Sequence, residues 1–136
     1  MKRKTLLKII KCLLNIFTVY EFNGLENIPP HGGVIIALNH LSYIDTPLLL
    51  TNPIRHDLIG LVTTKYKTNK FVSWFTDTAE GIWINRDAAD FTAIRSASKA
   101  LKKGLAVGIA PEGTRSNNGQ LQKGKPGIIM LAVKTG

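Results

Sequence analysis

The chain alternates between segments with apolar residues at helical spacing and short continuous apolar runs. Residues 1–22 place lysines on one side of a helix, with aliphatic side chains over the rest, which predicts an amphipathic helix. The continuous runs are typical of strands buried in a parallel sheet. We expect four strands, at residues 34–38, 58–63, 82–84 and 105–110.

Helical patterns separate these runs. Residues 69–79 and 91–101 repeat apolar side chains at helical spacing, and a last helix is expected to start near Pro126. Between the first two strands, Pro47 suits the first position of a further helix. Alternating strands and helices predict an α/β fold with a largely parallel sheet flanked by helices.

Polar residues follow three of the expected strands. His40 and Asp45 come after the first strand, Arg86 after the third, and the segment PEGTRS, residues 111–116, after the fourth. In open parallel sheets, ligands gather beyond the carboxyl ends of the strands. We therefore expect these side chains, distant in sequence, to line one crevice.

The spacing between His40 and Asp45 suits a turn better than a helix. On one regular helix five residues advance about 500°, so the two side chains would lie about 140° apart around the axis. In a turn from strand to helix, the Asp45 carboxylate can reach back to the imidazole. It would then fix the tautomer and orientation of a general base. The alternative is a helix-capping aspartate beside an ordinary turn histidine.

Arg86 and Arg115 are the residues at this edge that suit an anion. Each guanidinium can grip a phosphate through forked hydrogen bonds, and Gly113 lets the backbone approach a ligand. Either arginine alone would equally suit a surface ion pair. Glu112 could bind substrate hydroxyls or hold an arginine in place, and the sequence leaves both roles open.

The composition of the chain limits the kinds of partner that we expect it to bind. The 136 residues, 44% of them hydrophobic, suit one domain, and the formal charge of +9 indicates an anionic partner. We expect no nucleic acid, because no aromatic pattern is interleaved with the basic residues and no zinc spacing or recognition helix is present. The single cysteine, Cys12, excludes an internal disulfide, and the few histidines and cysteines give no expectation of a metal site.

The amphipathic segment at residues 1–22 has two interpretations. It could pack on the domain with a solvated polar face, or insert at an anionic membrane surface, which the basic residues clustered at its start favour. No stretch approaches the roughly 18 uncharged apolar residues of a membrane span. We therefore expect a membrane-associated chain at the cytoplasmic face, peripheral or monotopic rather than spanning.

Three segments together resemble a known enzyme family. NHLSYID, residues 39–45, resembles the N-H-x4-D signature of the glycerolipid acyltransferases, the family of the 1-acylglycerol-3-phosphate acyltransferases. GIWINR, residues 81–86, is similar to the second block of that family and PEGTRS to the third, in the family's order. The resemblance covers residues 24–136, and the basic amphipathic start is also like the family's membrane-seated N-terminus.

This resemblance implies acyl transfer in phospholipid synthesis. A fatty acyl group would pass from a thioester, on coenzyme A or acyl carrier protein, to the free hydroxyl of lysophosphatidic acid, giving phosphatidic acid. His40 would be the base and Asp45 its support. Residues of the second and third blocks and one lysine would bind the acceptor: Arg86, Glu112, Gly113, Thr114, Arg115 and Lys125. No cofactor is implied besides the acyl thioester as co-substrate.

The sequence also departs from the family pattern. Trp83 stands where phenylalanine is common, and Asn85 where aspartate is frequent. The chain stops at LAVKTG, where the family continues into a further strand with a proline-flanked fourth block. We expect the chain to divide into two parts, of which residues 1–22 form a membrane-associating helix. We expect residues 23–136 to form an acyltransferase domain that is incomplete at its C-terminus, with an exposed sheet edge prone to association.

Two alternatives stay open from the sequence. An acyltransferase of the same class could act on glycerol 3-phosphate or on another lysolipid. A chain without the fourth block could also be an inactive membrane-binding remnant, since a basic amphipathic helix binds anionic bilayers without catalysis.

Overall fold

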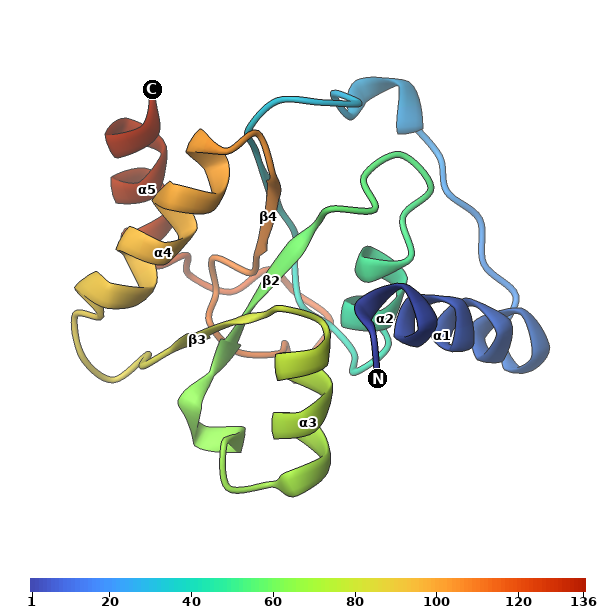
Figure 1. Ribbon diagram of the computed structural model, residues 1–136. Helices are drawn as coiled ribbons and strands as arrows, with labels where there is room; N and C mark the ends of the chain where they lie inside the picture. Colours follow the sequence, from blue (N-terminus) through green and yellow to red (C-terminus); the bar gives the residue numbers. More distant parts are fainter.

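A parallel sheet of four strands forms the centre of the protein, for which a computed structural model describes all residues, 1–136 (Figure 1). The strands are β1 (Val34–Ala37), β2 (Ile59–Thr63), β3 (Ile82–Ile84) and β4 (Ala106–Ile109), and their spatial order is β1-β4-β2-β3. Every pair of neighbouring strands is parallel. The predicted fold class and the predicted strands are confirmed.

Helices cover both faces of this sheet. They are α1 (Arg3–Phe17), α2 (Asp45–Leu50), α3 (Lys70–Thr78), α4 (Phe91–Lys102) and α5 (Gly127–Thr135), with short 3-10 helices η1 (Leu25–Asn27) and η2 (Thr64–Tyr66). In Figure 1, α4 and α5 lie on the opposite side of the sheet from α1 and α2. The helices predicted at residues 69–79, at 91–101 and near Pro126 are confirmed.

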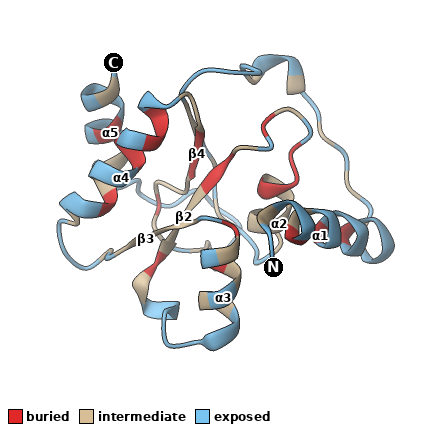
Figure 2. Ribbon diagram, viewed as in Figure 1, coloured by how far each residue is buried: buried red, intermediate tan, exposed pale blue.

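Alternate residues of the strands pack on opposite faces of the sheet. Ile36 and Ala106 pack with side chains of α1, α2 and α3. Ile35 and Val107 pack with side chains of α4 and α5. Figure 2 shows the buried residues along β4 and on the inner sides of the helices. Because both faces are covered, the strands contain few polar residues and read as continuous apolar runs.

The first helix is shorter than predicted. It ends at Phe17 rather than at residue 22, and the backbone N–H and the hydroxyl of Thr18 both donate to the Leu14 carbonyl, at 2.9 and 2.6 Å. Thr18 and Val19 are β-branched, and such residues lose side-chain freedom inside a helix. Residues 18–22 therefore lie outside α1, which corrects the predicted boundary.

The apolar side chains of α1 fall into a buried and an exposed group. Leu6, Ile10 and Leu14 are buried in the core, which confirms that the helix packs on the domain. A second set of apolar side chains remains exposed: Ile9, Leu13, Ile16 and Phe17. None of the helices combines the length and the apolar character that a membrane crossing requires.

The helix α2 begins two residues before Pro47. Asp45 is its first residue and Pro47 its third, so the prediction that Pro47 opens the helix is wrong. A proline is tolerated at this position because the N–H groups of the first helical turn have no partner within the helix. The earlier start places Asp45 directly after the turn that carries His40.

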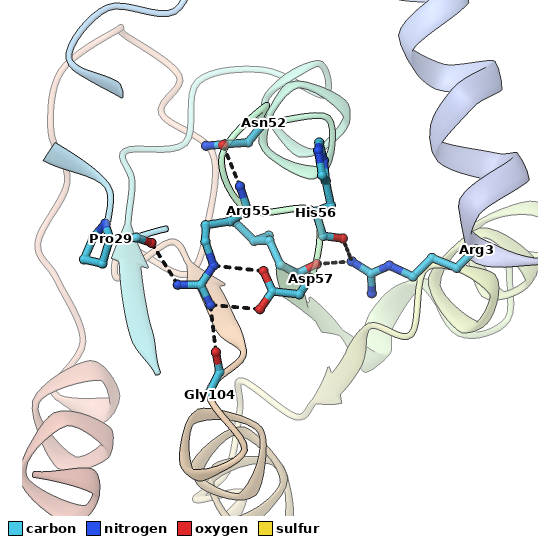
Figure 3. A network of polar contacts seen from close by, with 8 residues as sticks. Arg3, Pro29, Asn52, Arg55, His56, Asp57 and Gly104 are labelled. Carbon is cyan, nitrogen blue, oxygen red and sulfur yellow. Dashed lines mark hydrogen bonds and ion pairs between the residues drawn. The ribbon is translucent and has the colours of Figure 1, made fainter. Parts of the chain in front are cut away.

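A buried arginine joins the loops at the amino ends of three strands (Figure 3). The Arg55 side chain is 1% exposed and forms two hydrogen bonds to the Asp57 carboxylate, at 2.9 and 2.8 Å. The same guanidinium donates to the carbonyls of Pro29 and Gly104, at 3.0 and 2.8 Å. Pro29, Arg55 and Gly104 precede β1, β2 and β4, so this contact fixes the strand starts relative to one another.

Candidate active site

Residues that follow three of the strands converge at the carboxyl edge of the sheet. His40 follows β1, Arg86 follows β3, and Thr114 and Arg115 follow β4. These side chains line one cavity of ≈ 370 Å³, together with residues of α2, β2 and α3. The predicted crevice is therefore observed with an imidazole and two guanidinium groups, but Asp45 and Glu112, which were expected to line it, do not.

The His40 imidazole is hydrogen-bonded to the Asp45 carboxylate. Nδ1 of His40 lies 2.8 Å from Oδ2 of Asp45, so the turn brings the two side chains together as their spacing predicted. The backbone N–H groups of Leu41 and Ser42 donate to the same oxygen, each at 2.8 Å. Nε2 of His40 forms no hydrogen bond within the chain and is left for a ligand.

These contacts keep Asp45 ionised. Burial raises the pKa of Asp45, but the hydrogen bonds from Ser42, His40 and Leu41 together lower the pKa below its ordinary value. An ionised Asp45 accepts the Nδ1 proton of His40, which fixes the tautomer with a free Nε2. The carboxylate bonds to the preceding turn and caps none of the N–H groups of α2, so the helix-cap alternative does not describe it.

Glu112 is buried beside this turn. Its carboxylate accepts the backbone N–H of His40 at 3.3 Å and that of Gln122 at 3.0 Å. Nearby, the N–H of Ser116 donates to the His40 carbonyl at 2.7 Å. Glu112 forms no ion pair with an arginine and does not line the cavity. Instead of the two roles considered from the sequence, it fixes the His40 turn against the loop after β4.

The two arginines reach the cavity in different ways. Arg86 is half-buried and donates from Nη1 to the Gly113 carbonyl. Burial lowers the pKa of Arg86, and the electrostatic effect of the nearby Tyr66 side chain opposes this only in part. The Arg115 guanidinium lies 3.5 Å from the centroid of the Tyr43 ring, a cation–π contact. Both cations are thus held by contacts that leave N–H groups available to an anion.

Gly113 is required for this arrangement. Its φ of +69° is a left-handed conformation that glycine adopts without strain. A Cβ at this position would also approach the Lys125 side chain to 3.3 Å. Lys125 itself lies outside the His40 cavity: its Nζ is 3.4 Å from the Arg86 carbonyl, and it lines a second cavity of ≈ 280 Å³ on the α4 and α5 side.

The remaining cavity wall is mostly apolar, and the sequence did not predict it. The side chains that form it come from the His40 turn, from β2 and from η2 and α3: Tyr43, Leu61, Val62, Tyr66, Phe71, Val72 and Phe75. Tyr43 could have been noticed, because it lies inside the NHLSYID segment. The other residues carry no sequence signal that distinguishes a cavity wall from ordinary core.

The arrangement suits proton abstraction from a hydroxyl that sits near an anionic group. His40 can act as a base, the guanidinium groups can bind an anion, and the apolar wall can accommodate a hydrocarbon chain. No group of three or more His, Cys, Asp or Glu side chains lies together in a way that could hold a metal ion.

Comparisons with known proteins agree with this chemistry. The sequence matches the Acyltransferase family model over residues 19–136. It is 33% identical over 115 residues to the 1-acyl-sn-glycerol-3-phosphate acyltransferase of Borreliella burgdorferi, a match that covers 83% of this chain and 46% of that protein. The enzyme of the same name from Bacillus subtilis is 28% identical over 111 residues, covering 82% of this chain and 54% of that protein.

A solved structure has the same fold. The crystal structure of the 1-acyl-sn-glycerophosphate (LPA) acyltransferase, PlsC, from Thermotoga maritima is similar with a TM-score of 0.75 and 30% sequence identity. This match covers 98% of the present chain and 54% of the other chain. The chain thus spans about half the length of these relatives. Since the family match extends over most of its residues, the chain belongs to the Acyltransferase family.

Proposed function

We propose that the protein transfers a fatty acyl group from a thioester to the free hydroxyl of lysophosphatidic acid, giving phosphatidic acid. The observation that carries this proposal is the His40–Asp45 pair, joined at 2.8 Å on a cavity that also contains Arg86 and Arg115. The relatives named 1-acyl-sn-glycerol-3-phosphate acyltransferases support lysophosphatidic acid as the acceptor.

His40 is the general base of the proposed reaction. Its Nε2 takes the proton from the acceptor hydroxyl, and the hydroxyl oxygen attacks the carbonyl carbon of the thioester. The ionised Asp45 stabilises the imidazolium that forms. The carbon–sulfur bond then breaks, and the proton held by His40 passes to the departing thiolate. A thiolate leaves readily, so the reaction needs no second acid.

Arg86 and Arg115 bind the acceptor phosphate in this proposal. Their guanidinium groups lie on the same cavity as His40, and a guanidinium pairs with phosphate through two parallel hydrogen bonds. Thr114 lines the same cavity. Glu112 and Gly113 act by holding the His40 turn and Arg86 in position. Lys125 supports the backbone of Arg86 from the second cavity.

The acyl donor is a thioester of coenzyme A or of acyl carrier protein, and the protein acts at the cytoplasmic face of a membrane. The exposed apolar face of α1, with Ile9, Leu13 and Ile16, supports membrane association. Lysines on the opposite side of the helix favour an anionic lipid surface. The proposed association is peripheral, with α1 lying along the surface.

An acyl-transfer assay tests the base and the reaction together. Product formation from a labelled acyl thioester and lysophosphatidic acid in acidic liposomes is measured for the chain and for His40→Ala. We expect the rate to fall at least about 100-fold, the usual contribution of a general base. His31→Ala is the matched control, because His31 is exposed in a loop away from the cavity. A His40→Ala variant with full activity, or an unmodified chain that forms no product, would contradict the proposal.

The same assay identifies the acceptor. Glycerol 3-phosphate and other lysolipids replace lysophosphatidic acid at equal concentration, and we expect slower transfer to each of them. Faster transfer to one of these acceptors, still dependent on His40, would overturn lysophosphatidic acid as the substrate while keeping the acyl-transfer chemistry.

A further inference from the structure

An exposed aromatic surface lies on η2 and α3. Tyr66, Phe71 and Trp74 have exposed fractions of 43%, 69% and 43%. Exposed lysines accompany them at positions 65, 67 and 70, and no acidic residue occurs between residues 65 and 74. We call these six residues the α3 surface. Such a cluster of large apolar side chains is unusual on a protein surface unless something binds there.

Most of the α3 surface lies on a helix with a capped N-terminus. The Asn69 side chain caps α3 by accepting the N–H groups of Phe71 and Val72, at 3.0 and 3.1 Å. The rings of Phe71 and Trp74 are 5.8 Å apart. At about 100° per residue, Lys70, Phe71 and Trp74 fall on one arc of the helix, opposite the buried Thr76. The aromatic side chains are therefore presented outward from an ordered helix.

Two members of the α3 surface also line the His40 cavity. Tyr66 and Phe71 belong to the cavity wall as well as to the exposed surface. The α3 surface therefore adjoins the apolar wall of the cavity. Trp74, Lys67 and Lys70 contribute to the surface without lining that cavity.

We infer that the α3 surface is a contact with an anionic lipid bilayer, and that lipid substrates enter the His40 cavity across it. This inference rests on the proposed function and adds the route by which the substrate arrives. Tyrosine and tryptophan are enriched where proteins meet the membrane interface, and lysines near the surface attract anionic lipids. The formal charge of +9 acts in the same direction.

The charges around the surface favour this partner. Lys65 pairs with Asp87 at 3.3 Å, and the Lys67 ammonium lies 5.9 Å from the Trp83 ring centroid. Lys70 forms no ion pair. Asp77, further along α3, accepts the Trp83 indole N–H at 2.9 Å. Lys67 and Lys70 thus remain available to lipid headgroups. A soluble acidic protein would match these lysines but would leave Phe71 and Trp74 without a hydrocarbon partner.

Figure 1 shows α3 on the side of the molecule where the N-terminus of α1 lies. Arg3, the first residue of α1, donates to the carbonyl of Ala79 just after α3, at 2.8 Å. Both helices also contribute to the same part of the core. The exposed apolar face of α1 and the α3 surface are therefore carried by neighbouring helices, and the α3 surface is the one next to the cavity.

Tryptophan fluorescence tests the contact directly. The chain has two tryptophans, so Trp83→Phe leaves Trp74 as the only reporter. With vesicles of phosphatidylcholine and phosphatidylglycerol, we expect a blue shift of Trp74 emission. Bromine atoms on the lipid chains should quench that emission. Trp74 emission that stays unshifted and unquenched while the chain co-sediments with the vesicles would overturn the inference.

Charge substitutions provide a second readout. Lys67→Gln with Lys70→Gln should weaken binding to the anionic vesicles about tenfold, since each lysine near the surface contributes to the attraction. Lys99→Gln with Lys102→Gln, on α4 across the sheet, is the matched control with the same change of charge. Equal weakening by both pairs would show a long-range charge effect and would overturn a local contact.

These binding measurements do not require turnover, so they are independent of the proposed reaction. Trp74 emission that responds only to an acidic carrier protein, or that shifts only with a concentration-dependent dimer, would overturn the bilayer as the partner.

An activity measurement adds the link to substrate entry. Trp74→Ser should slow transfer to long-chain lysophosphatidic acid in vesicles but not to a short-chain, monomeric one. Phe91→Ser, at an exposed aromatic on α4, is the control.

Discussion

Three hydrogen bonds converge on one oxygen of Asp45. Oδ2 accepts from the His40 ring and from the N–H groups of Leu41 and Ser42, each at 2.8 Å. Hydrogen bonds to a carboxylate favour its charged form, and here they outweigh the partial burial that raises the pKa. Asp45 therefore remains an anion, which is what the proposed support of a general base requires.

Asp45→Asn should lower kcat about 100-fold or more and change KM little. An asparagine can occupy the same space, but its amide can donate to the ring and select the tautomer in which Nε2 carries the proton. Steady-state kinetics with lysophosphatidic acid measures the two constants. Asp87→Asn, at an exposed position outside the cavity, should leave both unchanged. A loss confined to KM would assign Asp45 to substrate binding instead.

The same variant should change the pH dependence of stability. The folded pKa of Asp45 is lower than the ordinary value of 3.8, so the unfolded chain binds a proton more readily as the pH falls. The stabilisation is present above the ordinary pKa and is lost as the pH falls through the folded pKa. The difference in unfolding free energy between the chain and Asp45→Asn should stay constant above about pH 5 and shrink as the pH falls further, through the folded pKa. Urea denaturation measures it, and a constant difference would contradict the assignment.

At the scale of the element, local patterns determine most of the fold. The run Ile82–Ile84 is a strand as predicted, and α4 ends just before Gly104, whose φ is +84°. The end of α1 could not be predicted from apolar periodicity. At this end the Thr18 hydroxyl donates a hydrogen bond to the Leu14 carbonyl. Periodicity counts the apolar side chains and does not register such a bond.

In the candidate site, too, some contacts could be predicted from the sequence and others could not. The contact between His40 and Asp45 could be predicted, because both residues lie in one short turn between a strand and a helix. The roles of Glu112 and Arg115 could not. Glu112 bonds to His40, 72 positions away in the sequence, and Arg115 stacks on Tyr43. Such contacts depend on how distant loops meet, which no local pattern specifies.

The approach of the end of α4 to the start of β1 gives a prediction at this scale. A Cβ on Gly33 would lie 2.2 Å from the Leu101 carbonyl oxygen, a backbone atom that cannot rotate away. Gly33→Ala should therefore lower the unfolding free energy by about 2 kcal/mol or more. Gly60→Ala is the matched control, since nothing lies within 4 Å of its added Cβ. Chemical denaturation measures both, and equal stabilities would contradict the close approach.

For the whole molecule, the carboxyl and amino ends of the strands carry different kinds of contact. The carboxyl edge carries His40 and the arginines that line the cavity. The amino edge carries the Arg55 network, in which one guanidinium binds a carboxylate and the carbonyls of two other loops (Figure 3). Hydrogen bonding to Asp57 raises the pKa of Arg55, and the same contact lowers the pKa of Asp57. The buried positive charge of Arg55 is thus balanced by the Asp57 carboxylate at the amino ends of the strands.

Removing this guanidinium should separate stability from catalysis. Arg55→Met leaves the Asp57 carboxylate and the carbonyls of Pro29 and Gly104 without their donor, and we expect a cost of about 3 kcal/mol in unfolding free energy. Thermal and urea unfolding measure this cost. Arg95→Met, at an exposed position on α4, should change stability by less than about 0.5 kcal/mol.

The kinetic half of the prediction follows from the position of Arg55. Because Arg55 does not line the His40 cavity, the folded Arg55→Met protein should keep its kcat/KM for lysophosphatidic acid. The assay is run at a temperature well below the lowered melting point and is normalised to the folded fraction. Unchanged stability would show that the network is not needed to hold the strand starts. A selective loss of kcat in a fully folded variant would instead show that the amino edge controls the geometry around His40 across the sheet.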